Sequence, residues 1–186
     1  MQKILNRPTL TNGPVSLRAP RAEDAQARYK LGNVPEIHHM FGADPAKVQP
    51  ITKAQATAWL HAQEVEPLAW VIEYRKRMTG ALRLHSLNEH DQRASLAIGI
   101  LNPKHLGKGI GTRAIRLIAE YAFNVIGLNR LTVRVVDYNK RAIAAYEKVG
   151  FVIEGRERQA ARVGEDWFDD VIMGLIAADF RAGKAA

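Results

Sequence analysis

The residues best suited to chemistry form a glycine-rich stretch, Leu106–Thr112, with glycine at the alternate positions 107, 109 and 111. Glycine permits backbone conformations that other residues avoid and lets a ligand approach closely. A helical pattern of apolar residues follows, so we expect the N–H groups to converge at the positive end of a helix dipole. This arrangement suits a pyrophosphate, and Lys108 and Arg113 add positive charge.

Two other phosphate-binding loops do not fit this stretch. A Walker A loop requires Gly-Lys followed by Ser or Thr, but Gly109 follows Lys108, and Asn102 stands at the earlier glycine position. A Rossmann fingerprint requires a third glycine where Thr112 stands. The glycine positions alone leave a simple turn as the alternative.

The elements that position this loop follow from hydrophobic periodicity. We expect strands over Val15–Arg18, Leu68–Tyr74, Met78–Leu84, Ala94–Leu101, Leu131–Val136, Phe151–Glu154 and Trp167–Ile176. We expect helices from Pro20 to about Leu31, from a Thr52 cap to about Gln63, from the glycines to Gly127, and over Lys140–Val149. Arg75–Arg77 reads as a turn and His85–Gln92 as a loop. The order predicts an α+β fold, with helices on a mixed, mostly antiparallel sheet of about seven strands.

Composition narrows the class of protein. The 186 residues suit one domain, 1–186, with 47% hydrophobic and 25% charged residues. The absence of cysteine excludes disulfides, thiolate metal sites and a cysteine nucleophile. No apolar run is long enough to span a membrane, and Pro8, Gly13 and Pro14 argue against a secretory signal, so we expect a cytoplasmic protein. The net charge of +8 is dispersed, which favours a solvated surface over a nucleic-acid or membrane site.

Two blocks together resemble the GNAT (Gcn5-related N-acetyltransferase) superfamily. Leu106–Gly111 corresponds to the family's Gln/Arg-x-x-Gly-x-Gly/Ala loop, with Leu106 in place of Gln or Arg. Asn139–Phe151 is similar to the family's Asn-x-x-Ala…Tyr-Glu-Lys-x-Gly-Phe. The resemblance covers about Leu68–Ile176 well and the N-terminal third loosely. Within the family the chain looks closest to the RimJ/RimL-like group, because of Leu17–Ala25 and Gly164–Leu175.

The resemblance implies a GNAT fold whose splayed central strands hold acetyl-CoA, and direct attack of an amine on the thioester. It places the acyl-CoA core in residues 94–151 and the acceptor side mainly in the N-terminal third. Tyr146 matches the family's general acid, although a packed aromatic is the alternative. Asn139 matches a contact to the pantetheine arm, or it is simply a helix N-cap. The implied cofactor-binding residues are Leu101, whose N–H would face the thioester oxygen, Leu106, Gly107, Lys108, Gly109, Ile110, Gly111, Thr112 and Asn139.

The general base is not identified by the sequence. The candidates near the central strands are Glu73, His85, Glu89, His90 and Asp91, and ordered water is the alternative. The adjacent pair His38-His39 lacks a third metal ligand. Pro35–Pro45 is interpreted as part of the acceptor wall. Glu165, Asp166, Asp169 and Asp170 either attract a cationic acceptor or form a solvated hairpin, and Trp59, Trp70 and Trp167 are expected in the core or the cleft.

Three classes of function follow. The first is an enzyme that acetylates a protein N-terminus or a small amine. The second is a non-catalytic acyl-CoA-binding or sensor module, and the third is a nucleic-acid- or ribosome-binding protein, which lacks a recognisable motif here. Dimers are common in the family, so a homodimer is an option.

Overall fold

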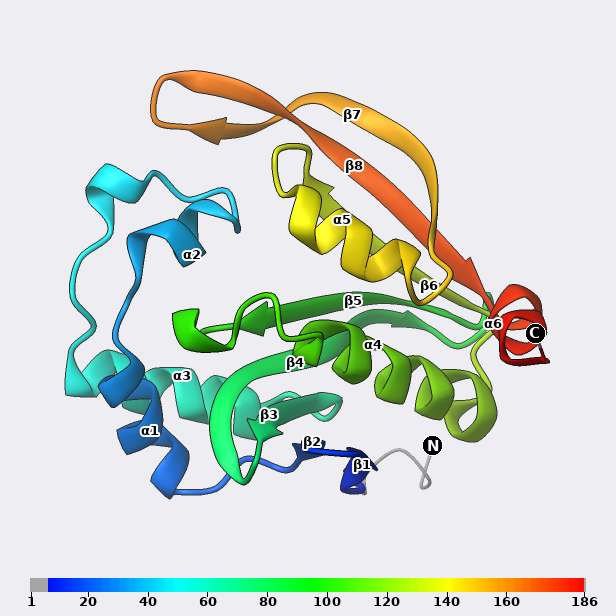
Figure 1. Cartoon of the computed structure of the whole chain (residues 1–186), viewed down its shortest axis with the longest axis horizontal. Coiled ribbons are helices and arrows are strands. Elements are labelled where there is room, and N and C mark those ends of the chain that lie inside the picture. The colour runs from blue at the N-terminus through cyan, green and yellow to red at the C-terminus, as the bar shows by residue number, and fades with distance from the viewer. Residues whose placement is uncertain (1–6, 186) are drawn as a thin grey trace.

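The computed structural model describes residues 7–185. Met1–Asn6, which belong to the N-terminal segment that was not expected to be a secretory signal, lie outside the described residues. Within these residues, eight strands form one sheet in the order β1-β2-β3-β4-β5-β6-β8-β7 (Figure 1). Every neighbouring pair is antiparallel except β5 and β6, which are parallel. The α+β prediction is confirmed, with one strand more than expected.

The strands lie close to their predicted positions, with extensions. They are β1 Leu10–Asn12, β2 Val15–Arg18, β3 Ala69–Tyr74, β4 Arg77–Asn88, β5 Arg93–Ile100, β6 Arg130–Val136, β7 Val152–Val163 and β8 Asp166–Ile176. The helices are α1 Glu23–Leu31, α2 Pro35–His39, α3 Lys53–Val65, α4 Ile110–Tyr121, α5 Lys140–Glu147 and α6 Ala177–Ala185. Single 3₁₀ turns precede α3 and α4, and a π-helical turn, Ala122–Ile126, extends α4.

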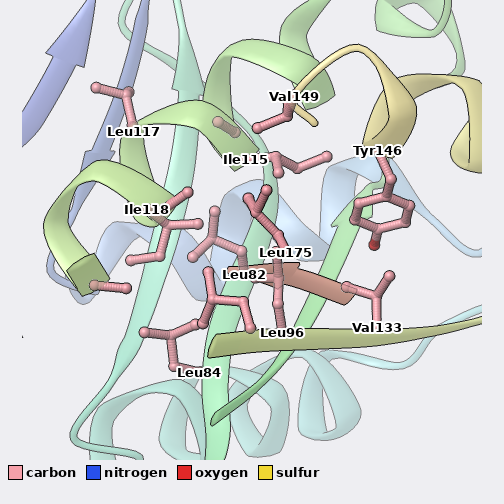
Figure 2. Packing of buried hydrophobic residues seen from close by; sticks show 14 of the residues in the cluster. Leu82, Leu84, Leu96, Ile115, Leu117, Ile118, Val133, Tyr146, Val149 and Leu175 are labelled. Carbon is pink, nitrogen blue, oxygen red and sulfur yellow. The ribbon is translucent and has the colours of Figure 1, made fainter. Parts of the chain in front are cut away.

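Helices cover both faces of the sheet. Trp70 and Ile72 of β3 belong to the main apolar cluster, and the Trp70 ring meets Tyr121 of α4 edge-on. Figure 2 shows the α4 residues Ile115, Leu117 and Ile118 of the same cluster. Strand alternation sends Ala69 and Val71 to the opposite face, where they are also buried and where α3 packs on β3. The sheet is therefore the middle layer of the molecule.

Local sequence signals locate several boundaries correctly. Thr52 caps α3 with a complete capping box, and the π-helical turn after α4 ends at Gly127, whose φ is 85°. The turn at Arg75 and Lys76 is confirmed, since both residues have positive φ values of 51° and 63°.

Two predicted bounds differ from the structure, and three elements were not predicted. The loop predicted over His85–Gln92 begins only after Asn88, because β4 continues through a register shift between His85 and Asn88. The strand predicted over Phe151–Glu154 extends to Val163 as β7. The short elements β1 and α2 and the C-terminal α6 were not expected at all.

Candidate active site

The site begins where β5 and β6, the one parallel strand pair within residues 7–185, come apart. β5 and β6 pair through Arg93–Ser95 and Arg130–Thr132, yet the two strands continue to Ile100 and Val136. A cavity of about 890 Å³ occupies the parted region, a volume suited to a cofactor-sized ligand. Its walls come from β5, β6, the glycine loop, α5, the segment around α2, and the β7–β8 hairpin. Figure 1 shows how these elements are arranged.

The glycine loop forms one end of this cavity. Gly107 and Gly109 have φ values of 74° and 70°, a left-handed conformation that favours glycine. An added Cβ at Gly107, Gly109 or Gly111 would meet no atom within 4 Å, so the loop is open on this side. The first helical bond of α4 runs from Arg113 N–H to the Gly109 carbonyl, which leaves the N–H groups of residues 110–112 for a ligand. The residues present therefore fit a pyrophosphate.

The cations at the cavity differ from those expected. Lys108 lies outside its lining, in a separate pocket beside Arg75 and Arg77. Arg113 is also outside the lining and donates from Nη1 to Asn12 Oδ1 at 3.2 Å. Besides Arg134 of β6 and Arg162 of β7, the cavity is lined by Arg141 and Lys148. Arg141 and Lys148 are seven positions apart, along and just past α5, so they lie on one face of the helix. This spacing is the sequence signal that could have identified them.

Tyr146 of α5 combines burial with access to the cavity. Its side chain packs edge-on against Phe151, with ring centroids 5.3 Å apart, and lines the cavity. Figure 2 shows the ring reaching from α5 toward Val133 of β6 with the hydroxyl at its free end. Within residues 7–185 the hydroxyl has no hydrogen-bond partner, and burial raises the pKa of Tyr146 well above its ordinary value. The phenol is thus a protonated donor available to a ligand.

The expected position of the oxyanion donor needs a correction. The Leu101 N–H donates to the Thr79 carbonyl at 2.8 Å, and Leu101 does not line the cavity. Because N–H directions alternate along a strand, the N–H groups of Ile98 and Ile100 point away from β4, toward the parted side. Both residues line the cavity, so they replace Leu101 as the available donors.

Asn139 connects the two sides of the cavity. Its Oδ1 accepts from the Ala142 N–H at 3.1 Å, which confirms the N-cap interpretation. Its Nδ2 donates to the Met40 carbonyl at 2.9 Å, and the neighbouring Tyr138 hydroxyl donates to the His39 carbonyl at 2.6 Å. These bonds hold the segment around α2 against the end of β6, where Ile37, Met40 and Phe41 line the cavity.

Among the five candidate bases, only His85 lines the cavity. Burial, aided by Arg83, lowers the pKa of His85 despite Glu66. Glu73 instead accepts from Arg18 at 2.6 Å, and Glu89, His90 and Asp91 lie at the β4–β5 turn outside the lining. Asp170, one of the four acidic residues that were predicted either to attract a cationic acceptor or to form a solvated hairpin, also lines the cavity.

The remaining candidates are spread over the molecule. Trp70 is fully buried, as expected, whereas Trp167 is 54% exposed at the hairpin and outside the cavity lining. His39 stacks on Tyr138 with centroids 4.5 Å apart. Within residues 7–185 no three His, Cys, Asp or Glu side chains gather as a metal site, and no helix there has both the length and the hydropathy to cross a membrane.

Parted parallel strands, a glycine loop at a helix N-terminus and a buried tyrosine at their junction are the features expected of a coenzyme A-dependent acyltransferase. Residues 15–152 match the family model described as an acetyltransferase (GNAT) domain, and the chain belongs to this family.

Relatives and solved structures agree with this assignment. A spermidine N(1)-acetyltransferase of Escherichia coli (strain K12) is 29% identical over 141 residues, covering 76% of this chain and 74% of that protein. A putative ribosomal N-acetyltransferase of Bacillus subtilis (strain 168) is 30% identical over 111 residues, covering 60% of each. The fold matches a spermidine N-acetyltransferase from Vibrio cholerae solved with CoA and spermine, with TM-score 0.76, 22% identity, and coverage of 91% of this chain and 99% of that one. The chain is thus an acetyltransferase that moves an acetyl group from acetyl-CoA to an amine.

Proposed function

We propose that this chain transfers acetyl directly to a primary amine, with Tyr146 protonating the departing thiolate and no covalent enzyme intermediate. The observation that carries this proposal is that the free hydroxyl of Tyr146 and the open side of the glycine loop line one cavity. A thiol nucleophile is excluded, because the chain has no cysteine.

The other roles follow from the positions of the groups in the cavity. The N–H groups of residues 110–112, with Arg141 and Lys148, would bind the pyrophosphate of acetyl-CoA. The N–H of Ile98 or Ile100 would stabilise the oxygen that becomes negative during attack. Residues 94–151 then form the donor side, and the N-terminal third, through the segment around α2, contributes to the acceptor side of one domain.

The acceptor is proposed to be a primary amine that is protonated at neutral pH. Two relatives are named for spermidine and for aminoglycosides, whose primary amines are protonated at neutral pH, and a third is named a putative ribosomal N-acetyltransferase. The motifs at Leu17–Ala25 and Gly164–Leu175 support a place in the RimJ/RimL-like group. We also propose a cytoplasmic protein, a homodimer in solution and no specific nucleic-acid partner, which light scattering and polynucleotide retention would test.

The function is tested with acetyl-CoA and a panel of amines, namely spermidine, putrescine, an aminoglycoside and peptides with free N-termini, while free thiol is monitored. We expect thiol release with at least one class of amine. Tyr146→Phe should lower kcat by about 10²- to 10⁴-fold, the usual contribution of a general acid, and leave acetyl-CoA affinity unchanged.

Tyr121→Phe is the matched control, because Tyr121 is another buried helical tyrosine, but it lies outside the cavity lining. If acetyl-CoA binds, no amine releases thiol, and Tyr146→Phe changes nothing, the chain is a non-catalytic acyl-CoA-binding module instead.

A further inference from the structure

Asp170 holds a position in the cavity that no role described above explains. It lies on β8, opposite Val136 of β6 and Glu157 of β7, and is only 3% exposed. Among the described residues that line the cavity it is the only carboxylate. A buried charge without a function is costly, so this placement calls for a ligand or a strong partner.

Strand alternation places Asp170 on the far side of the sheet from the glycine loop. Val171 and Met173 of β8 belong to the apolar cluster beneath α4 and α5, as do Val133 and Val135 of β6. Asp170 therefore projects to the opposite face of the sheet. A cavity that passes between parted strands thus has its phosphate-binding groups at one end and this carboxylate at the other.

The partners of Asp170 within the described residues do not saturate its carboxylate. Arg134 approaches Oδ2 with Nε at 3.1 Å, but Arg134 is 64% exposed and also pairs with Glu157 at 3.7 Å. Burial raises the pKa of Asp170, Arg134 opposes this, and Glu157 and Asp137 add to it.

Besides Arg134, one polar group lies near Asp170 and another lines the same cavity. Tyr138 is close enough for Asp170 to raise the pKa of its phenol. Arg162 of β7 lines the same cavity and lies over the Trp167 ring at 5.6 Å. Within residues 7–185 Arg134 contacts Oδ2 of Asp170, and no hydrogen bond or ion pair reaches Oδ1, so an ammonium group could donate to this second oxygen.

We propose that Asp170 binds the ammonium group of the acceptor amine and so makes the cleft selective for cationic over neutral acceptors. The inference rests on the proposed function, since it names the residue that receives the amine at the same cavity. A carboxylate that is held in place and largely removed from water discriminates strongly between an ammonium and a hydroxyl group of similar size.

The direct test measures amine binding rather than turnover. Spermidine and n-butylamine are titrated calorimetrically into CoA-saturated wild type and Asp170→Asn, with n-butanol as the neutral probe. We expect Asp170→Asn to weaken binding of both amines at least tenfold, to leave n-butanol binding unaffected, and to change acetyl-CoA affinity less than twofold. In steady-state assays the KM for the amine should rise more than kcat falls.

Glu157→Gln is the matched control, because it removes a carboxylate that also pairs with Arg134 but lies outside the cavity lining. It should change amine affinity less than threefold. Three results would each overturn the proposal. They are an equal loss of amine affinity in Glu157→Gln and Asp170→Asn, unchanged amine affinity in Asp170→Asn, and no amine binding to the wild type.

A second variant decides the question even if Asp170→Asn fails to fold. Arg134→Gln removes the competing cation and should tighten amine binding at least twofold, whereas equal or weaker binding contradicts the inference. The two proposals fail in distinguishable ways. Amine binding that depends on Asp170 without thiol release refutes catalysis alone, and acetyl transfer that is insensitive to Asp170→Asn refutes only the role of Asp170.

Discussion

The phenol of Tyr146 differs from a surface tyrosine by its burial, which raises its pKa well above the ordinary value of about 10. The folded protein therefore keeps this proton throughout the range in which amines lose theirs. We expect kcat to rise with pH as the bound amine becomes neutral, with no descending limb from Tyr146 up to about pH 10. A pH–rate profile checks this, and a descending limb below about pH 9 that disappears in Tyr146→Phe would contradict it.

Asn139 has two functions that one substitution separates. Asn139→Asp keeps an oxygen that caps α5 but loses the donor to the Met40 carbonyl, so the segment around α2 should be held less firmly. We expect the free energy of unfolding to fall by about 1–3 kcal/mol and the KM for the amine to rise. Chemical denaturation and steady-state kinetics measure both effects.

Asn139→Ala loses the helix cap as well, so its free energy of unfolding should be lower than that of Asn139→Asp by about 1 kcal/mol. Equal stability of the two variants would show that the cap contributes nothing.

At the level of single residues, the sequence predicted the position of the site better than the direction of its side chains. Residues Leu106, Asn139 and Tyr146 line the cavity as their motifs suggested, whereas Leu101 and Lys108 do not. The sequence names a residue in a loop or strand, but the side of the backbone it faces depends on strand pairing and loop curvature. For the same reason the sequence does not separate Asp170 from the other acidic candidates, Glu165, Asp166 and Asp169.

The left-handed turn at Gly109 begins α4, and a second left-handed glycine, Gly127, follows the helix. Gly109→Ala and Gly127→Ala should each destabilise the fold by about 1–2 kcal/mol, since both force a Cβ into a left-handed conformation. Only Gly109→Ala places a methyl group on the open side of the ligand loop, so only it should weaken acetyl-CoA binding, by at least tenfold. Thermal denaturation measures the loss of stability, and calorimetric titration measures acetyl-CoA binding. Equal acetyl-CoA affinities of Gly109→Ala and Gly127→Ala would argue against the loop as the binding site.

Elements with strong local signals were predictable, and those defined by their neighbours were not. Thr52 with Gln55 specifies a helix start through contacts within one turn. β7 is an edge strand that is exposed along most of its length, so its sequence lacks the alternation of buried residues that marks a strand. The end of β4 looked like a loop because it is polar and Ser86 has a φ of 52° next to the register shift.

On the scale of the whole molecule, Arg18 fastens the N-terminal segment to the sheet. It is 4% exposed and bonds both oxygens of Asp24 at 2.7 Å and Glu73 at 2.6 Å. Burial alone would lower the pKa of Arg18, but the bonds to the two carboxylates outweigh this and raise it. Arg18→Met should destabilise the protein by about 3–5 kcal/mol, because it leaves two carboxylates without their buried partner.

Urea denaturation measures the decrease in the free energy of unfolding that Arg18→Met causes. Arg93→Met is the control, because the exposed pair of Arg93 with Asp91 should contribute less than about 1 kcal/mol. A similar effect of the two substitutions would contradict the assignment of Arg18.

The parted strands also divide the sheet into two blocks, β1–β5 and β6–β8, whose ladder is continuous over only three residue pairs. A cosubstrate in the gap touches both blocks and thereby couples their opening motions. Amide hydrogen exchange at Ile98 and Ile100 should be fast in the free protein and slow when acetyl-CoA is bound, with protection spreading to β6. Ligand at a hundred times its Kd adds about 2.7 kcal/mol of stability, so the cooperativity of unfolding should itself increase with ligand concentration. Bound acetyl-CoA would therefore join the two blocks of the sheet into a single cooperative unit.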